Sequence, residues 1–295
     1  MTDYVKQHGG SISFPANGQS WVILSDIEKR IKEKIEKIGT PLKDWDISIY
    51  RGILTGCNAA FIINKDKREE LIKKSPNSAE IIRPILRGKD IKRYGYKFAD
   101  LYLINTHNGI SAKGIPAVDI KKYPVIKAHL DKYWTKIKNR DDQGITPYNL
   151  RSCAYTDDFS KQKIIYPNMT KFLPFYYDTQ SYFTNQKCFI ITGENTAFLT
   201  AYLNSSLFKY CFRDNFPELQ GGTRELSKIF FDNIPIIQVT NETNKIYERK
   251  ILEIQYLRTQ NINTKSNEIE IDNMIFDLYK LSEKERNNIG FIEIK

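Results

Sequence analysis

The sequence holds little of what metal centres, disulfide scaffolds and membrane spans require. Only four cysteines and three histidines occur among its 295 residues. The cysteines lie far apart and form no C-x-x-C pair, and the histidines add no ligand spacing to them. We therefore expect free thiols in a reducing cytoplasm and no structural zinc. No apolar run approaches the roughly 20 residues that a bilayer span needs, so we expect no membrane partner.

Motifs for DNA chemistry and phosphate transfer are missing too. The chain has no Pro-Pro pair, and so lacks the Asn/Asp-Pro-Pro-Tyr-like loop of amino methyltransferases, and no Gly-Lys-Ser/Thr phosphate loop occurs. Glu248-Arg249-Lys250 matches the E-x-K string of magnesium-dependent nucleases, but it falls within a predicted surface helix and we interpret it as chance. We predict no catalytic residue, cofactor or metal site in this chain itself.

What the chain does contain is an uneven basic excess. It has 45 Lys and Arg against 35 Asp and Glu, a net charge of +10. Residues 240–295 hold 9 of the basic and 10 of the acidic residues, which leaves 36 against 25 in residues 1–239. A basic body suits a phosphate backbone or an anionic membrane. The alternative is a generally Lys-rich composition without a partner.

The periodicity of apolar residues predicts an α+β fold. Strands are expected at 47–50, 60–63, 101–105, 163–166, 175–178, 188–192 and 229–237, and helices at 25–38, 64–74, from 124, from 195, at 243–258 and at 269–279. Ser25 with Glu28, and Ser282 with Glu285, form capping boxes, and Asn195 is expected to cap the helix that follows it. We expect a flexible lead-in or linker over residues 1–20, a β-rich domain with peripheral helices over 21–239, and a helical C-terminal segment over 240–295.

One glycine-rich loop is the most informative stretch. It runs from Arg51 to Phe61 with the sequence RGILTGCNAAF. Gly52 and Gly56 permit sharp turns and close approach of the backbone to another group. Thr55 and Asn58 offer hydrogen-bonding side chains from this loop, and Arg51 offers a planar fork of donors. A tight turn without a ligand remains the alternative.

Two further segments carry clustered basic residues. Residues 83–93 contain Arg83, Arg87, Lys89, Lys92 and Arg93 between apolar residues that should face the core. Residues 220–228 form a flexible polar loop with two glycines, Arg224 and Lys228. Either segment could follow a phosphate backbone. A solvated surface is the alternative for the first, with Asp90 pairing locally.

The glycine-rich loop resembles the GI-x-TG-x-N-x-AF signature of the TaqI-like C-terminal specificity domain of type IIG restriction-modification enzymes and DNA adenine methyltransferases. Further segments are similar to that family in the same order, namely IRPILRGKDI at 82–91, LRSCAY at 150–155, KIIYP at 163–167, AYLNS at 201–205, NIPI at 233–236 and IDNMIFDLY at 271–279. The resemblance implies double-stranded DNA as partner in a bacterial cytoplasm. It also implies that S-adenosylmethionine and magnesium act in separate methyltransferase and endonuclease domains.

We therefore interpret the chain as a target-recognition domain that directs a catalytic domain to its site. The residues expected to contact DNA are Arg51, Thr55, Asn58, Arg83, Arg87, Lys89, Arg93, Lys171, Arg224 and Lys228. Arginine suits guanine and asparagine suits adenine in the major groove, whereas lysines suit phosphates. Three alternatives remain: a separately encoded specificity subunit, a nuclease with unrecognised carboxylates, and a protein-interaction module whose basicity is incidental.

Overall fold

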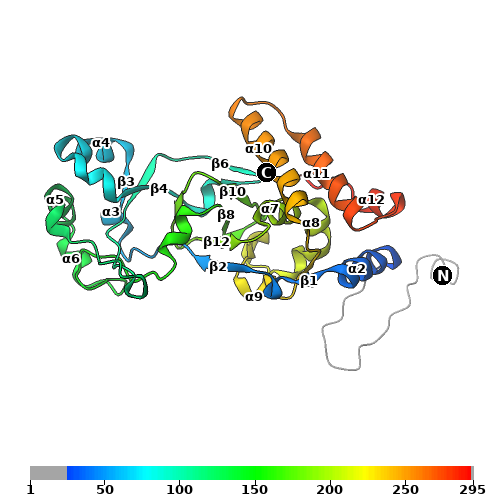
Figure 1. The fold of residues 1–295 in the computed structure, drawn as a ribbon, viewed down its shortest axis with the longest axis horizontal. Helices are drawn as coiled ribbons and strands as arrows, with labels where there is room; N and C mark the ends of the chain where they lie inside the picture. Colours follow the sequence, from blue (N-terminus) through cyan, green and yellow to red (C-terminus); the bar gives the residue numbers. More distant parts are fainter. Residues whose placement is uncertain (1–24, 294–295) are drawn as a thin grey trace, which may run out of the picture.

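A four-stranded antiparallel sheet lies at the centre of the computed structural model, which describes residues 25–293 (Figure 1). Its strands, in spatial order, are β10 (Tyr176–Asp178), β8 (Lys163–Pro167), β12 (Cys188–Gly193) and β2 (Ile47–Arg51). Neighbouring strands are in register, with Ile164 of β8 opposite Ile191 of β12. The lead-in predicted for residues 1–20 lies outside the described residues.

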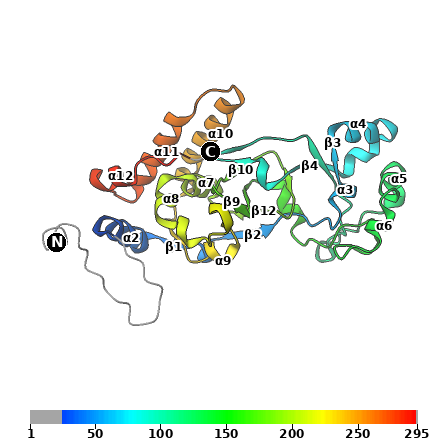
Figure 2. The same cartoon turned by 180° about the vertical axis from the view of Figure 1, so that it is seen from behind.

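Both faces of this sheet are buried. Ile164, Tyr166 and Ile191 belong to one hydrophobic core, whereas Ile165 and Ile190 belong to a second one. Successive side chains of a strand point to opposite faces, so each neighbour along the strand enters a different core. The sheet therefore separates two lobes, which extend to either side of it along the length of the molecule (Figures 1 and 2).

One lobe is mainly helical. Its helices are α2 (Asp26–Ile38), α7 (Thr196–Asn204), α8 (Ser206–Phe212), α9 (Lys228–Phe231), α10 (Asn241–Thr259), α11 (Lys265–Leu278) and α12 (Glu283–Ile289). Helix α7 is buried throughout and lies between the sheet and α10. Two ribbons complete this lobe, β1 (Thr40–Pro41) with β14 (Pro235–Ile236), and β9 (Met169–Thr170) with β13 (Arg224–Glu225). Helices α10–α12 share a core with α2 and α7, and the predicted boundary at residues 239/240 stays a prediction.

The other lobe surrounds a second four-stranded sheet. Its strands, in spatial order, are β11 (Phe183–Thr184), β4 (Ile82–Leu86), β7 (Leu101–Ile104) and β3 (Ile62–Asn64). Helices α3 (Asn58–Phe61), α4 (Lys65–Lys74), α5 (Pro124–Asp131) and α6 (Trp134–Ile137) surround it, and the ribbon of β5 (Ile91–Lys92) and β6 (Gly95–Tyr96) leads back to the central sheet. Short 3-10 helices join the elements, at Leu42–Asp44, Pro76–Ile81, Gly88–Asp90, Ser111–Lys113, Ile120–Lys122, Thr156–Ser160, Arg213–Asn215 and Gln220–Gly222.

The predicted α+β class is confirmed, as are most of the predicted elements. Both capping boxes are present at the starts of α2 and α12. In α2 the carboxylate of Glu28 accepts from the backbone N–H of Ser25 at 2.7 Å, and the Ser25 hydroxyl accepts from the backbone N–H of Glu28 at 3.3 Å. The apolar stripe of this helix is buried at Ile31 and Ile35.

Three local predictions were wrong. Residues 60–61 belong to the helical turn α3 and not to a strand, because the backbone N–H of Phe61 bonds to the carbonyl of Cys57. The strand predicted over 229–237 shrinks to β14, and α9 takes its first residues. Asn195 precedes α7 but does not cap it with its side chain. Its φ of 52° lies outside the extended region that capping needs, and its amide donates to the carbonyl of Val239 instead.

A buried ion pair joins the two strands at one side of the central sheet. Lys163 of β8 lies directly opposite Asp178 of β10, both side chains are fully buried, and Nζ lies 2.5 Å from Oδ2. Nζ also donates to the carbonyl of Phe159, while Asp178 accepts from the backbone N–H groups of Gln180 and Tyr182. Burial lowers the pKa of Lys163, and the carboxylate opposes this effect. Each charge of the pair therefore has its counterion and further hydrogen-bond partners within the protein.

Replacing Lys163 by methionine should lower the free energy of unfolding by about 3–5 kcal/mol, because Asp178 is left buried without its counterion. Lys161→Met is the matched control. Lys161 forms an ion pair of 2.7 Å with Asp158 on the preceding turn, but its side chain is 60% exposed, so the destabilisation should stay below about 1 kcal/mol. Urea denaturation of both variants measures the difference, and equal destabilisation would contradict a special role for the buried pair.

Candidate nucleic-acid interface

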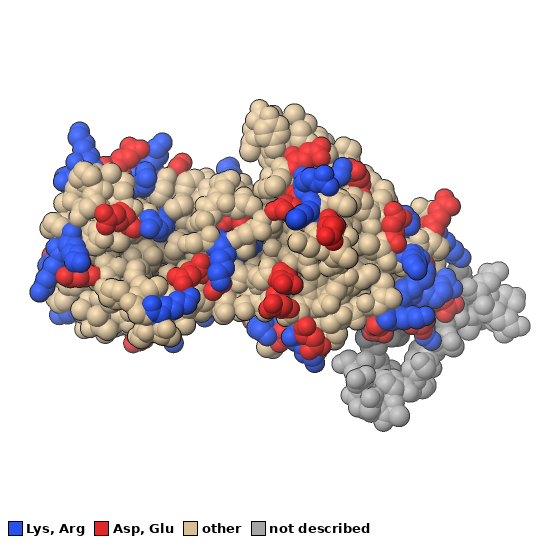
Figure 3. All heavy atoms as spheres, viewed as in Figure 1, with Lys and Arg blue, Asp and Glu red and all other residues tan. Residues whose placement is uncertain are grey.

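Charge is not segregated over the surface as a whole. On the face shown in Figure 3, basic and acidic side chains are interspersed over both lobes. Many of them are paired, such as Lys127 with Asp131 at 2.9 Å and Lys228 with Asp232 at 2.7 Å. Because paired charges largely cancel at a distance, the net charge does not locate a site. Cations without an acidic partner are the informative ones.

Such cations line one hollow of about 560 Å³ that we call the basic groove. It lies between the segments 87–92, 169–174 and 185–187. Its lining residues are Arg87, Gly88, Lys89, Ile91, Lys92, Met169, Thr170, Lys171, Phe172, Pro174, Asn185 and Lys187. None of these twelve residues is acidic. The four lysines make no ion pair with a carboxylate among residues 25–293.

The remaining cation of the basic groove is held in place by its neighbour. Arg87 donates through Nε and Nη2 to the two carboxylate oxygens of Asp90, at 2.9 and 2.8 Å. The same carboxylate accepts from the Arg87 backbone N–H at 2.8 Å. The hydrogen bonds to Asp90 raise the pKa of Arg87. Asp90 is buried, so it orients the guanidinium without adding an acidic group to the surface of the groove.

The turn at 185–187 gathers segments that are distant in sequence. Arg51 donates from Nε to the carbonyl of Gln186 at 3.1 Å, and the backbone N–H of Asn168 bonds to the carbonyl of Lys187 at 2.8 Å. A Cβ added to Gly52 would lie 2.0 Å from the carbonyl oxygen of Asn185. The first glycine of the loop therefore serves close backbone packing. It brings the exposed Arg51 to the edge of the basic groove.

A second hollow of about 330 Å³ lies where two of the quoted sequence segments meet. Residues 51–54 form one wall and residues 150–156 another, with Asn105 and His107 between them. Burial lowers the pKa of His107, with a further contribution from Arg83, so the imidazole is neutral at pH 7. Burial raises the pKa of the Cys153 thiol, and raises the pKa of Tyr155 to about 12. Tyr155 stacks on Tyr50 at a ring-centroid distance of 4.2 Å. This hollow thus carries cations at Arg51 and Arg151, the latter paired with Asp142 at 3.3 Å, but no ionised acid in its lining.

The structure brings together only part of the predicted set. Arg87, Lys89 and Lys171 line the basic groove, and Arg51 lies beside it. Asn58 and Lys228 are exposed but do not line the groove, and Lys228 pairs with Asp232. Arg83 is half-buried and donates to the carbonyls of Ala79 and Ile82.

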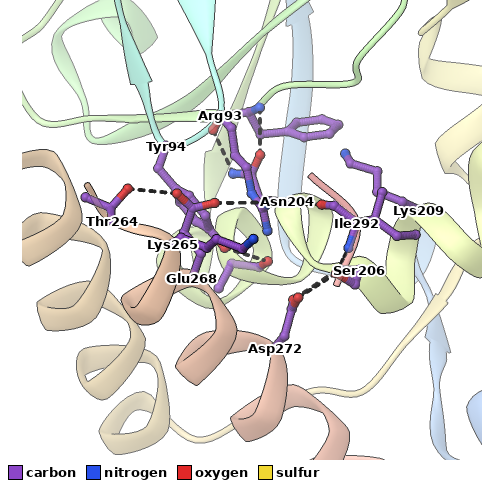
Figure 4. Close-up of polar contacts among 12 residues, drawn as sticks. Arg93, Tyr94, Asn204, Ser206, Lys209, Thr264, Lys265, Glu268, Asp272 and Ile292 are labelled. Atoms are coloured by element: carbon purple, nitrogen blue, oxygen red, sulfur yellow. Dashed lines mark hydrogen bonds and ion pairs between the residues drawn. The ribbon is translucent and has the colours of Figure 1, made fainter. Parts of the chain in front are cut away.

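Three residues predicted to contact DNA are buried and have partners inside the protein, so their contact with DNA stays a prediction that their burial disfavours. Thr55 is buried and its hydroxyl donates to Asn58 Oδ1 at 2.6 Å. Arg224 is buried and donates to the Phe216 carbonyl, to Asp214 and to Glu218, each at 2.9 Å. Arg93 is 2% exposed and pairs with Glu268 at 3.1 Å, which joins the segment after β5 to α11 (Figure 4). These side chains stabilise the fold.

Sequence reasoning also missed residues. Lys92 belongs to the basic cluster at 83–93 but is not among the residues predicted to contact DNA, and it lines the basic groove. Lys187 lines it too, and nothing in its local pattern distinguishes it from other surface lysines. Arg140 is buried and donates to the carbonyl of Thr55 at 2.6 Å and to carbonyls in the 142–149 loop, so it holds the glycine-rich loop. Glu248 of the E-x-K string accepts from the hydroxyl of Tyr177 at 2.9 Å, which gives it a structural partner.

Comparison with known proteins identifies the family. The sequence model of the TaqI-like C-terminal specificity domain matches residues 83–236, just over half of the chain. The glycine-rich loop and helix α11 lie outside the matched range. No curated protein sequence matches. Within residues 25–293, no helix is long and apolar enough to cross a membrane.

Two solved structures are similar in fold. The structure of the type IIL restriction-modification enzyme MmeI in complex with DNA is 12% identical, with a TM-score of 0.60 over 85% of this chain and 36% of that one. The type IIG restriction endonuclease BpuSI is 16% identical, with a TM-score of 0.51 over 86% of this chain and 33% of that one. This chain thus spans about a third of each enzyme. From the family match and its agreement with the observed fold, the chain belongs to the family of TaqI-like C-terminal specificity domains.

Proposed function

We propose that this chain is the sequence-specific double-stranded DNA recognition domain of a type IIG-like restriction-modification enzyme or N6-adenine DNA methyltransferase. In this proposal the domain holds duplex DNA and directs a separate catalytic domain to one short site. S-adenosylmethionine and magnesium would act in the catalytic domains, and we derive no chemical step within this chain. Among residues 25–293, no group of three or more His, Cys, Asp and Glu side chains is placed to hold a metal ion.

The basic groove is the observation that supports the proposal best. Five cationic side chains converge on it from three segments, and no carboxylate lines it. When unpaired lysines neutralise phosphates, the cations condensed on the DNA are released, and this release drives binding. Phe172 and Met169 are each 46% exposed in the same groove. They offer apolar contacts to sugars or base edges beside the phosphate contacts.

Within the proposed interface, the roles of Arg51 and the lysines differ. Arg51 donates from Nε to the backbone carbonyl of Gln186. The two terminal nitrogens of its guanidinium group are therefore left to bind the O6 and N7 atoms of a guanine. Lys89, Lys171 and Lys187 carry flexible point charges suited to phosphates. We therefore propose Arg51 as a reader of sequence and the lysines as contacts that position the duplex.

Neutralising the groove lysines should weaken DNA binding and its dependence on salt. For the triple variant Lys89→Gln, Lys171→Gln and Lys187→Gln, we expect the log–log slope of affinity against salt to fall by about 0.9 for each phosphate that is no longer neutralised. Fluorescence anisotropy with a duplex of randomised sequence over a salt series measures this slope.

The control removes the same charge elsewhere. Lys37, Lys73 and Lys284 are exposed on α2, α4 and α12 and have no acidic partner within the described part of the chain. Changing these three lysines to glutamine should leave the slope near that of the unmodified chain. An equal fall in both triple variants would indicate a net-charge effect. Absence of salt-dependent binding by the unmodified chain would favour a protein-interaction module.

Changing Arg51 to alanine should relax sequence preference more than it weakens overall binding, because a bidentate contact to a base contributes about 1–3 kcal/mol of discrimination. Selection of bound duplexes from a randomised library measures the preference at each position. Lys187→Ala is the comparison, and it should lower affinity evenly for all sequences. Unchanged selection by the Arg51 variant would exclude Arg51 as a reader.

A further inference from the structure

A smaller cavity adjoins the basic groove on the side of helix α8. Its volume is about 330 Å³, and it shares Lys171 and Phe172 with the groove. Its other lining residues are Leu173, Lys209, Arg213, Gly222, Ile292 and Glu293. Three cations from two segments thus meet here, Lys171 after β9 and Lys209 with Arg213 at the end of α8, and Glu293 is the one acidic residue in the lining. None of the three cations forms an ion pair within the described residues.

Lys209 is the unusual member of this set, because it is 6% exposed and has no carboxylate within ion-pair distance in the described part of the chain. Its ammonium group donates to the carbonyl of Leu203 at 2.7 Å and to the carbonyl of Leu173. It also lies over the rings of Phe175 and Phe208, at 4.9 and 5.1 Å from their centroids. An ammonium group has three N–H donors, and two of them are used by these carbonyls. A buried cation without an anion is costly, and a bound anion would offset that cost.

The surroundings of Lys209 disfavour its charged form unless an anion lies nearby. Burial lowers the pKa of Lys209 well below the ordinary value, Arg93 lowers it further, and Asp272 opposes the effect. Asp272 is itself engaged, since its carboxylate accepts from the backbone N–H and hydroxyl of Ser206 at 2.9 and 2.5 Å. This buried acid already accepts hydrogen bonds from α8. The positive charge of the cavity therefore comes first from Lys171 and Arg213, and a bound anion would stabilise the charged form of Lys209 as well.

The C-terminal segment lies across the same cavity. The backbone N–H of Ile292 donates to Ser206 Oγ at 2.9 Å, and its carbonyl accepts from Arg93 Nη1 at 3.1 Å. Figure 4 shows Ile292 beside Lys209. Ser206 and Lys209 both lie on α8. The next residue, Glu293, lines the cavity and is exposed. The carboxylate of Glu293 thus lines the same cavity as the three cations.

We propose that the cavity formed by Lys171, Lys209 and Arg213 is a binding site for one phosphate group, and that Glu293 competes with that group. Two sources share this chemistry. One is a backbone phosphate of the duplex held in the basic groove, which rests on the proposed function, and the other is free phosphate. Lys209 supplies the fixed, dehydrated donor, while Arg213 supplies a planar fork suited to phosphate oxygens.

Titration calorimetry of the full chain with inorganic phosphate tests the site, with chloride at equal ionic strength as the reference. Arg213→Gln should weaken phosphate binding by about tenfold, since a charge-assisted contact contributes roughly 1.5 kcal/mol or more. Glu293→Gln should strengthen phosphate binding several-fold by removing the competing carboxylate. Arg249→Gln, an exposed position on α10, should leave phosphate binding unchanged.

A second measurement separates the two sources. If the phosphate belongs to DNA, Arg213→Gln should also lower the salt slope of duplex binding by about 0.9. An unchanged slope together with weakened phosphate binding assigns the site to free phosphate. Failure of the unmodified chain to bind duplex DNA would contradict the proposed function. The phosphate titration would still decide whether the cavity binds phosphate. Absence of phosphate binding above the chloride reference, or identical titrations for the Arg213 and Glu293 variants and the unmodified chain, would overturn the proposal.

Discussion

Burial of both faces of the central sheet is the constraint on which the rest of the structure depends. Neighbouring residues of β8, such as Ile164 and Ile165, enter opposite hydrophobic cores. A shift of the strand by one residue would exchange the side chains between the two cores, so the register is strongly specified. The same register places Lys163 opposite Asp178, and their ion pair is satisfied only in this pairing.

The central sheet determines the position of the basic groove. The turn at 185–187 leads into β12, so a central strand determines where the turn lies. The glycine-rich loop, the segment around Arg87 and the end of β8 all pack against that turn. Cations that are far apart in the sequence, such as Lys89 and Lys187, thereby line one hollow. The surface proposed to meet DNA is thus attached to the most deeply buried part of the molecule.

Charged residues fall into two groups with different physical roles. Lys163, Arg93 and Arg224 are buried and their charges are compensated by carboxylates. Removing one partner from such a pair destabilises the fold, so these residues serve stability. Lysines of the basic groove are uncompensated and act at the surface, where their charge is available to a ligand. MmeI and BpuSI share this fold at 12% and 16% sequence identity, which fits a scaffold set by core packing.

The sequence by itself determined the α+β class, the family, the capped starts of α2 and α12, and the three longer strands of the central sheet, because these depend on local periodicity and on short motifs. It also singled out Arg87, Lys89 and Lys171, but it could not separate them from Arg93 and Arg224. Whether an arginine is exposed or paired within the protein depends on residues far away in the chain, such as Glu268 for Arg93. Only the tertiary structure decided this, because ion pairing and burial arise from distances in space and not from spacing along the chain.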